Sequence, residues 1–206
     1  MALSVYFYVP NLIGYGRIVL AFVGYAYALS NYRVTLGSYL LSQTLDAADG
    51  FAARALGQSS TFGAVLDMVT DRASTTCLCV VLGHLYPHLI PALCGLVMLD
   101  MISHWYHMYA SLLLGSDSHK KVTNPILAFY YWKPVLFVEC AATELWYLAL
   151  YTLAFTEGPP VLGVPVARLL LMVCTPFFAF KQVCNLVQGA VACNALVEHD
   201  MKKKPK

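Results

Sequence analysis

Apolar residues recur along the chain in runs long enough to cross a lipid bilayer, and short polar turns separate these runs. A helix needs about 20 apolar residues to span the hydrocarbon core. We therefore predict an all-α membrane protein with six transmembrane helices, at residues 11–29, 35–53, 62–84, 89–114, 134–155 and 164–193. The fourth and last segments exceed the required length, so we expect them to tilt or to extend into water.

The composition also indicates a lipid environment. Of the 206 residues, 59% are hydrophobic and 12% are charged, whereas soluble domains have roughly 45–50% and 25%. We predict one integral-membrane domain over residues 1–206, with a short interfacial segment at 1–10 and a cytosolic basic tail at 199–206. The seven cysteines lie in predicted spans without disulfide or zinc spacing, so we interpret them as core residues.

Basic residues gather on one side of the predicted topology. With six spans both termini share a side, which also receives the connections that contain Arg54, Lys120 and Lys133. Cytosolic loops carry an excess of Lys and Arg, so we predict that both termini lie in the cytosol. A lysine-rich tail beside a membrane domain fits a solvated end near anionic lipid, and we predict no nucleic-acid role.

The last four residues, 203–206, resemble a dilysine retrieval signal. This resemblance predicts the endoplasmic reticulum membrane, with the Golgi as an alternative. A plain basic flank is the competing interpretation.

Acidic residues are few, yet four of the eleven fall within 26 positions, at Asp46, Asp49, Asp67 and Asp71. The first two are three apart and the last two are four apart, so each pair shares one helix face. A short connection sets the two predicted helices side by side, and all four carboxylates can then converge. A carboxylate at the bilayer centre costs roughly 3 kcal/mol, so we expect a ligand to compensate the cluster.

Oxygen ligands without His or Cys among them favour hard cations. Two divalent ions, Mg²⁺ or Mn²⁺, would balance the four negative charges. Two other interpretations remain open: ion pairs with Arg54 and Arg72, or a cation pathway in a transporter.

Small residues flank the carboxylates, as they do where a bulky anion approaches a helix backbone. Gly50 and Ala53 share the face of the first carboxylate pair, and Gly63 lies one turn before the second pair. Arg54 supplies a guanidinium group and Ser60 a hydroxyl, and both groups are suited to binding a phosphate.

These residues form the pattern Asp46-x2-Asp49-Gly50-x2-Ala53-Arg54-x8-Gly63-x3-Asp67-x3-Asp71, which resembles the signature of the CDP-alcohol phosphatidyltransferase family at every fixed position. The resemblance implies a six-helix domain, usually a homodimer. It further implies that the four Asp residues hold the metals, that Gly50, Arg54 and Ser60 contact the CDP-lipid, and that Asp71 is the general base. Asn11, Arg17, Ala53 and Gly63 are weaker nucleotide candidates.

Segments outside the motif resemble eukaryotic members of this family that use myo-inositol; they lie at 10–18, 61–72, 103–105, 115–120, 124–125, 130–131 and 157–159. This resemblance implies transfer of the phosphatidyl group from CDP-diacylglycerol to myo-inositol, which gives phosphatidylinositol and CMP. One alternative is another acceptor, such as glycerol 3-phosphate, serine or an aminoalcohol. An alternative of another class is a cation transporter or lipid-binding scaffold without turnover.

A pocket for a neutral polyol should offer several hydrogen-bond donors and acceptors. The candidates for such a pocket are Ser116, His119, Lys120, Tyr130 and Lys133, each of which is also compatible with ordinary interfacial polarity. Arg17 can either reach the nucleotide or snorkel to the interface.

Further polar residues lie in the second half of the chain. Asp100, His104 and His107 share a helix face and form either a hydrogen-bonded stripe, which we favour, or a metal site. Glu139 and Glu144 are interpreted as polar groups that face the bundle.

Overall fold

The computed structural model of the protein describes residues 2–115, 124–161 and 163–203, and it divides the chain into two compact units, Met1–His88 and Leu89–Lys206. Each unit is built almost entirely from helices. The carboxylate cluster lies within the first unit, and all five predicted polyol candidates fall in the sequence range of the second.

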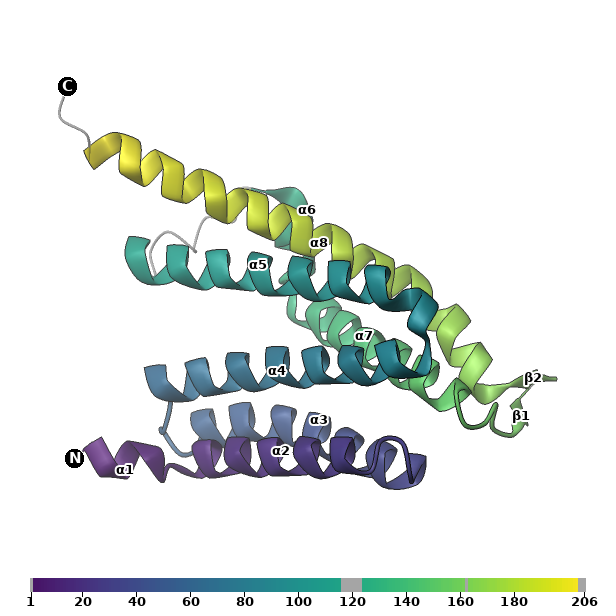
Figure 1. Cartoon of the computed structure of the whole chain (residues 1–206). Helices are drawn as coiled ribbons and strands as arrows, with labels where there is room; N and C mark the ends of the chain where they lie inside the picture. Colours follow the sequence, from purple (N-terminus) through teal and green to yellow (C-terminus); the bar gives the residue numbers. More distant parts are fainter. Residues whose placement is uncertain (1, 116–123, 162, 204–206) are drawn as a thin grey trace. The chain divides into compact units, whose positions relative to one another are not determined.

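The first unit contains a short helix α1 (Ala2–Tyr6) and three long helices, α2 (Val9–Ala26), α3 (Tyr32–Ala55) and α4 (Thr61–Leu85) (Figure 1). Helix α2 packs against both α3 and α4. Small buried residues on α2, among them Gly14, Ala21 and Gly24, allow this close approach. Thr35 Oγ1 then donates to the carbonyl of Gly24 at 2.9 Å and locks the α2–α3 contact.

Polar side chains define where the long helices begin. Asn31 caps α3 by accepting from two backbone N–H groups, and Ser60 Oγ caps α4 by accepting from Gly63 N at 3.0 Å. Gly57, with φ of +63°, lies in the short turn between α3 and α4. Contrary to the sequence prediction, the turn does not pack α3 directly along α4; both helices pack against α2 instead, and the two carboxylate pairs meet around a side chain of α2.

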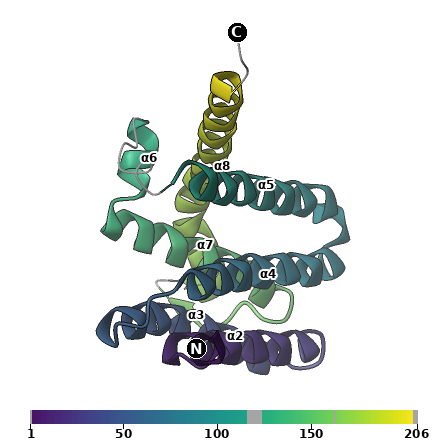
Figure 2. The same cartoon turned by 90° about the vertical axis from the view of Figure 1, so that its left-hand side faces the viewer.

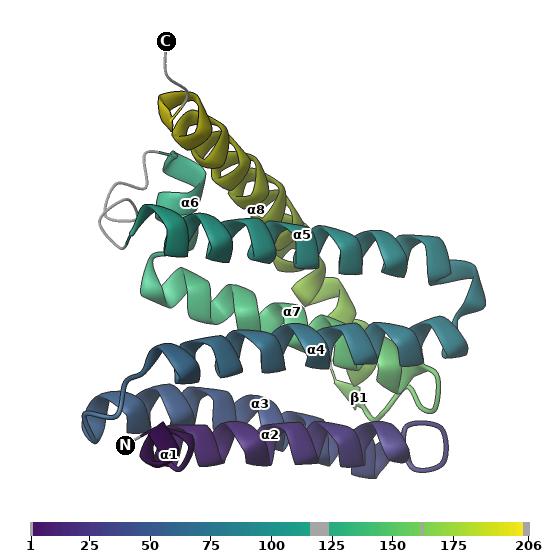
Figure 3. The same ribbon diagram turned by 60° about the vertical axis from the view of Figure 1, so that its left-hand side comes forward.

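The second unit follows the short 3₁₀ helix η1 (Pro87–Leu89). It contains α5 (Ile90–Leu114), α6 (Pro125–Tyr130), α7 (Lys133–Leu153), the strands β1 (Pro160–Val161) and β2 (Val164–Pro165), and α8 (Val166–Lys203). Helix α8 packs against α5, α6 and α7 and is the longest helix of this unit (Figures 2 and 3). Trp146 stacks on Phe178 at 3.9 Å and donates to Thr175 at 3.1 Å, which fixes α7 on α8.

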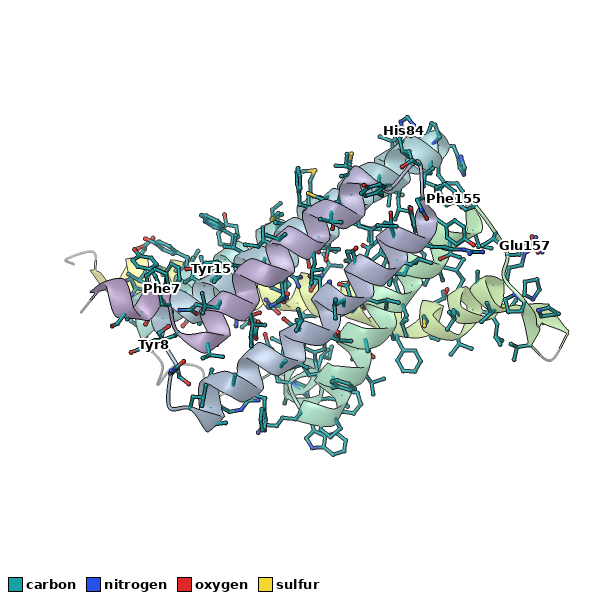
Figure 4. All side chains as sticks on the ribbon, turned by 90° about the horizontal axis from the view of Figure 1, so that it is seen from below. Phe7, Tyr8, Tyr15, His84, Phe155 and Glu157 are labelled. Carbon is teal, nitrogen blue, oxygen red and sulfur yellow. The ribbon has the colours of Figure 1, made fainter. Side chains whose placement is uncertain are left out.

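The connection from α7 to α8 is a small antiparallel pairing of β1 and β2. Figure 4 labels Phe155 and Glu157 in the segment before β1. Glu157 forms an ion pair with Arg168 in the first turn of α8, at an exposed position. The hairpin and this ion pair tie the ends of α7 and α8 together.

The all-α membrane fold is confirmed, and the chain is a multi-pass membrane protein. Within the described residues, four segments are long and apolar enough to cross a bilayer: Val9–Ala26, Pro87–Leu114, Lys133–Leu153 and Val166–Lys202. Helices α3 and α4 fall outside this group; they carry the Asp pairs as well as arginines. The count of six spans therefore stays a prediction.

Three boundaries differ from the sequence prediction. Residues 2–6 form a helix inside the predicted interfacial segment, and α6 was not predicted at all. Helix α8 continues to Lys203, ten residues past the predicted end at 193, and takes in much of the predicted tail. The apolar pattern predicts only where a helix leaves the lipid. Residues 194–203 contain no Gly or Pro, so α8 can continue as a helix beyond the apolar run.

Candidate active site

Aspartates from two helices converge in the first unit, as their spacing predicts. Carboxylate oxygens of Asp46, Asp49 and Asp67 all lie within 4.8 Å of one another. Asp71, one turn beyond Asp67 on α4, joins the group through a shared cationic partner. Asp49 is buried, whereas the side chains of Asp46 and Asp67 are 39% and 48% exposed, so the cluster is open on one side.

The shared partner is Arg17 on α2. Its Nη1 lies 2.9 Å from Asp49 Oδ2 and 2.7 Å from Asp67 Oδ1, and its Nη2 lies 2.6 Å from Asp46 Oδ1. Nη2 also pairs with Asp71 Oδ1. The Arg17 side chain is only 1% exposed, so the snorkelling interpretation is wrong: the guanidinium points into the cluster.

The charges in the cluster do not balance. One guanidinium faces four carboxylates, and Arg72 adds a single longer contact, 3.9 Å to Asp71 Oδ2. Carboxylates taken out of water need full compensation. An all-oxygen donor set of this kind suits a hard divalent cation, so the residues present fit a metal ion.

The predicted nucleotide candidates surround a small cavity beside the carboxylates. The cavity has a volume of about 160 Å³ and is lined by residues from α2, α3, α4 and the α3–α4 turn: Pro10, Asn11, Gly14, Asp49, Gly50, Ala53, Gln58, Ser59, Ser60, Gly63, Ala64, Leu66 and Asp67. Arg54 is exposed and lies beside Gly50, where a Cβ added to the glycine would meet Arg54 Nη1 at 3.5 Å. The structure thus brings one end of the cavity against the carboxylate cluster.

Asn11 and Gly63 approach each other closely at the wall of this cavity. A Cβ on Gly63 would lie 2.8 Å from Asn11 Oδ1 and 3.1 Å from Ser60 Oγ. Asn11 is 1% exposed, and its Nδ2 donates to the carbonyl of Val5 at 2.6 Å. The glycine is therefore required by close packing.

The N-terminal segment packs beside this wall. These contacts were not predicted from the sequence. Val9 N donates to Gln58 Oε1 in the α3–α4 turn at 2.8 Å, and Tyr6 packs edge-on against Phe62 at 4.9 Å. Figure 4 labels Phe7 and Tyr8 in this segment, ahead of Tyr15 on α2. The aromatic residues near the N-terminus were the available signal, but their partners lie some fifty residues away.

The predicted polyol candidates give a mixed result. Ser116, His119 and Lys120 lie outside the described residues. Lys133 is exposed at the start of α7, and Tyr130 is buried at the end of α6, with Lys181 Nζ 5.6 Å from its ring centroid. Burial raises the pKa of Tyr130 above its ordinary value, so its hydroxyl stays protonated at neutral pH.

A buried polar cluster in the second unit was not predicted. Lys181, Asn185 and Gln188 lie at positions i, i+4 and i+7 on α8 and are each less than 7% exposed. Tyr131 donates to Gln188 Oε1 at 3.0 Å, and burial raises the pKa of Tyr131 to about 12. The helical spacing of the three α8 residues was the signal that could have found this cluster.

The stripe on α5 faces the same cluster. Asn185 Nδ2 lies 3.4 Å from Asp100 Oδ1, and His104 Nδ1 lies 3.4 Å from the same oxygen. His107 stacks on the Tyr131 ring at 6.2 Å. These contacts support the hydrogen-bonded stripe over the metal site. On α7, Glu139 is 5% exposed and Glu144 is half-buried.

Comparison with protein families identifies the class. Residues 7–198 match the model of the CDP-alcohol phosphatidyltransferase family. The chain belongs to this family, whose signature carries the converging aspartates described above.

Individual relatives are similar over nearly their whole length. The CDP-diacylglycerol–inositol 3-phosphatidyltransferase of Homo sapiens is 42% identical, with 98% of this chain and 97% of that protein covered. The enzymes of the same name from Mus musculus and Schizosaccharomyces pombe are 41% and 42% identical, with 98% of this chain and 97% and 93% of the relatives covered. No solved structure matches the chain.

Proposed function

We propose that this enzyme transfers the phosphatidyl group from CDP-diacylglycerol to myo-inositol and releases phosphatidylinositol and CMP. The observation that carries the proposal is the identity of about 40% to enzymes named for this reaction, over nearly the full length of both chains. The carboxylate cluster and the adjoining cavity offer a binding site for the CDP-lipid within the first unit.

The four aspartates would hold two divalent ions, Mg²⁺ or Mn²⁺. Their support is the all-oxygen donor set and the incomplete neutralisation of its charge by Arg17. Divalent ions bound there would supply positive charge to the phosphoryl oxygens of the diphosphate. We assign contacts with the CDP-lipid to Gly50, Arg54 and Ser60, and weaker ones to Asn11, Ala53 and Gly63, because most of these residues line the cavity.

A side chain of the protein takes up the proton that the attacking hydroxyl releases. An inositol hydroxyl oxygen attacks the phosphorus that carries diacylglycerol, the phosphoanhydride bond breaks, and CMP leaves. Asp71 accepts the hydroxyl proton as general base. The family resemblance supports this role, and Asp71 lies one helical turn beyond Asp67, outside the three carboxylates that come within 4.8 Å of one another.

The residues that bind the acceptor stay a prediction. Of the predicted candidates, Tyr130 is supported by its buried hydroxyl near Lys181, and Lys133 by its position at the start of α7. A phosphorylated acceptor would call for several Arg or Lys residues, so the lysines among the candidates keep glycerol 3-phosphate as the alternative that the assay below must exclude.

The setting of the enzyme follows from its sequence. We propose a homodimer in the endoplasmic reticulum membrane or Golgi, with both termini and the active site facing the cytosol. The family resemblance supports the dimer, and the basic loops and lysine-rich tail support the orientation.

A purified-protein assay tests the function. The enzyme in detergent with CDP-diacylglycerol and Mn²⁺ should release CMP when myo-inositol is added, and should not do so with glycerol 3-phosphate, serine or ethanolamine. Release with one of the other acceptors and not with inositol would refute the acceptor. CMP release with none of them, in a protein that binds the nucleotide, would favour a binding protein.

The Asp71→Asn variant is the internal control for the chemistry. It removes the proton acceptor while keeping the side chain's shape, so turnover should fall by about 10²–10⁴-fold. Near-normal turnover in this variant would remove Asp71 from the mechanism.

A further inference from the structure

Arg17 contacts one oxygen of each carboxylate that a metal ion in this cluster would use. Its two terminal nitrogens contact one carboxylate oxygen from each of the four aspartates, three of them at 2.6–2.9 Å. Mg²⁺ would bind such oxygens at about 2.0–2.1 Å. An ion and the guanidinium therefore compete for the oxygens that Arg17 contacts, which are one of the two oxygens of each carboxylate.

The position of Arg17 is determined by the carboxylates. The Arg17 backbone is anchored where Ser42 Oγ donates to its carbonyl at 3.1 Å, and the side chain reaches from α2 across to α3 and α4. Its Nε is buried and has no hydrogen-bond partner among the described residues. Contacts of the two Nη atoms with the four carboxylates therefore hold the guanidinium, and a divalent ion would compete for these same groups.

The charge of Arg17 also lowers the affinity of the cluster for a divalent ion, although the four carboxylates together outweigh it. Without any cation, four carboxylates this close would repel one another strongly. With Arg17 in place, a divalent ion entering the cluster would meet a positive charge within a few ångströms.

We infer that Arg17 is the counter-ion of the metal-free cluster, and that it yields its carboxylate contacts when divalent ions bind. This inference rests on the proposed metal-dependent function and adds to it a positioning residue that sets the metal affinity. Arg17 keeps the four carboxylates assembled before the metal arrives, at the cost of competing with it.

The test compares Arg17→Gln with Arg33→Gln. Arg33 is an exposed arginine on α3 whose removal makes the same change in net charge. Free Mn²⁺ is titrated by electron paramagnetic resonance in detergent without nucleotide, and thermal unfolding is followed with EDTA and with saturating Mn²⁺. These readouts do not depend on turnover.

We expect Arg17→Gln to bind Mn²⁺ at least about tenfold more tightly than the wild type, because a neighbouring positive charge is gone. Its melting temperature in EDTA should fall below that of Arg33→Gln and recover with Mn²⁺. Equal or weaker Mn²⁺ binding, or a metal-free protein as stable as Arg33→Gln, would overturn the inference.

A second variant covers the case in which Arg17→Gln does not fold. In Arg17→Lys a single ammonium cannot bridge four carboxylates, so its metal-free melting temperature should fall and its Mn²⁺ affinity should rise severalfold. Wild-type values for both would overturn the inference. A wild-type protein that binds no Mn²⁺ would instead refute the proposed metal site itself.

Discussion

Gly63 offers a sharp test of the cavity wall. In Gly63→Ala the new methyl group would lie 2.8 Å from Asn11 Oδ1 and 3.1 Å from Ser60 Oγ. Neither neighbour moves freely, because Asn11 is buried and bonded to Val5, and Ser60 caps α4 through Gly63 N. The substitution must therefore shift α1 and α2 against the start of α4, or break the cap.

The cost can be estimated from these contacts. Overpacking a close contact costs about 1–3 kcal/mol, and a lost serine cap costs about 1 kcal/mol. The better helix propensity of alanine offsets at most about 1 kcal/mol. We expect a net loss of about 1–2 kcal/mol, which corresponds to a fall of a few degrees in melting temperature for a chain of this size.

Gly63→Ala should also change the KM for CDP-diacylglycerol, because Gly63 lines the cavity. If CDP-diacylglycerol binds beside Gly63, displaced wall atoms should raise its KM by about 5- to 30-fold, the equivalent of 1–2 kcal/mol. The KM for inositol should stay unchanged.

Gly37→Ala is the matched control for this experiment. Gly37 lies on α3 in the same unit, and a Cβ there meets nothing within 4 Å. This variant should melt at or slightly above the wild-type temperature. If Gly63→Ala behaves like Gly37→Ala in both melting temperature and KM, the argument from close packing is refuted.

Two further predictions concern single hydrogen bonds. Ser60→Ala should lose about 1 kcal/mol of stability with the α4 cap, whereas Ser60→Thr should keep most of it; equal melting temperatures for the two variants would contradict the capping role. Tyr131→Phe removes the 3.0 Å bond to Gln188 and leaves a buried amide unsatisfied, at a cost of about 1–3 kcal/mol. Thermal unfolding measures that cost, and an unchanged midpoint would show that Gln188 finds another partner.

Local spacing was sufficient to predict the carboxylate cluster. Asp46 and Asp49, and then Asp67 and Asp71, repeat at intervals that put each pair on one helix face, and the short α3–α4 turn keeps the two pairs near each other, although both helices pack on α2. The lengths of the apolar runs likewise located the long helices to within a few residues, except at the end of α8.

Partners distant in sequence were beyond such reasoning. The cluster of Lys181, Asn185 and Gln188 has a visible helical period, yet its meaning depends on Tyr131 and Asp100, which α6 and α5 bring to it. Period alone does not tell whether a polar face meets water, lipid or another polar face.

The sequence by itself determined the helices, the family signature and the convergence of four acidic groups, because each follows from the period of a helix and a short turn. Only the tertiary structure decided that Arg17 lies among them. Its reach from α2 depends on small residues that let α2 pack on α3 and α4 together, and this is a property of three surfaces in contact.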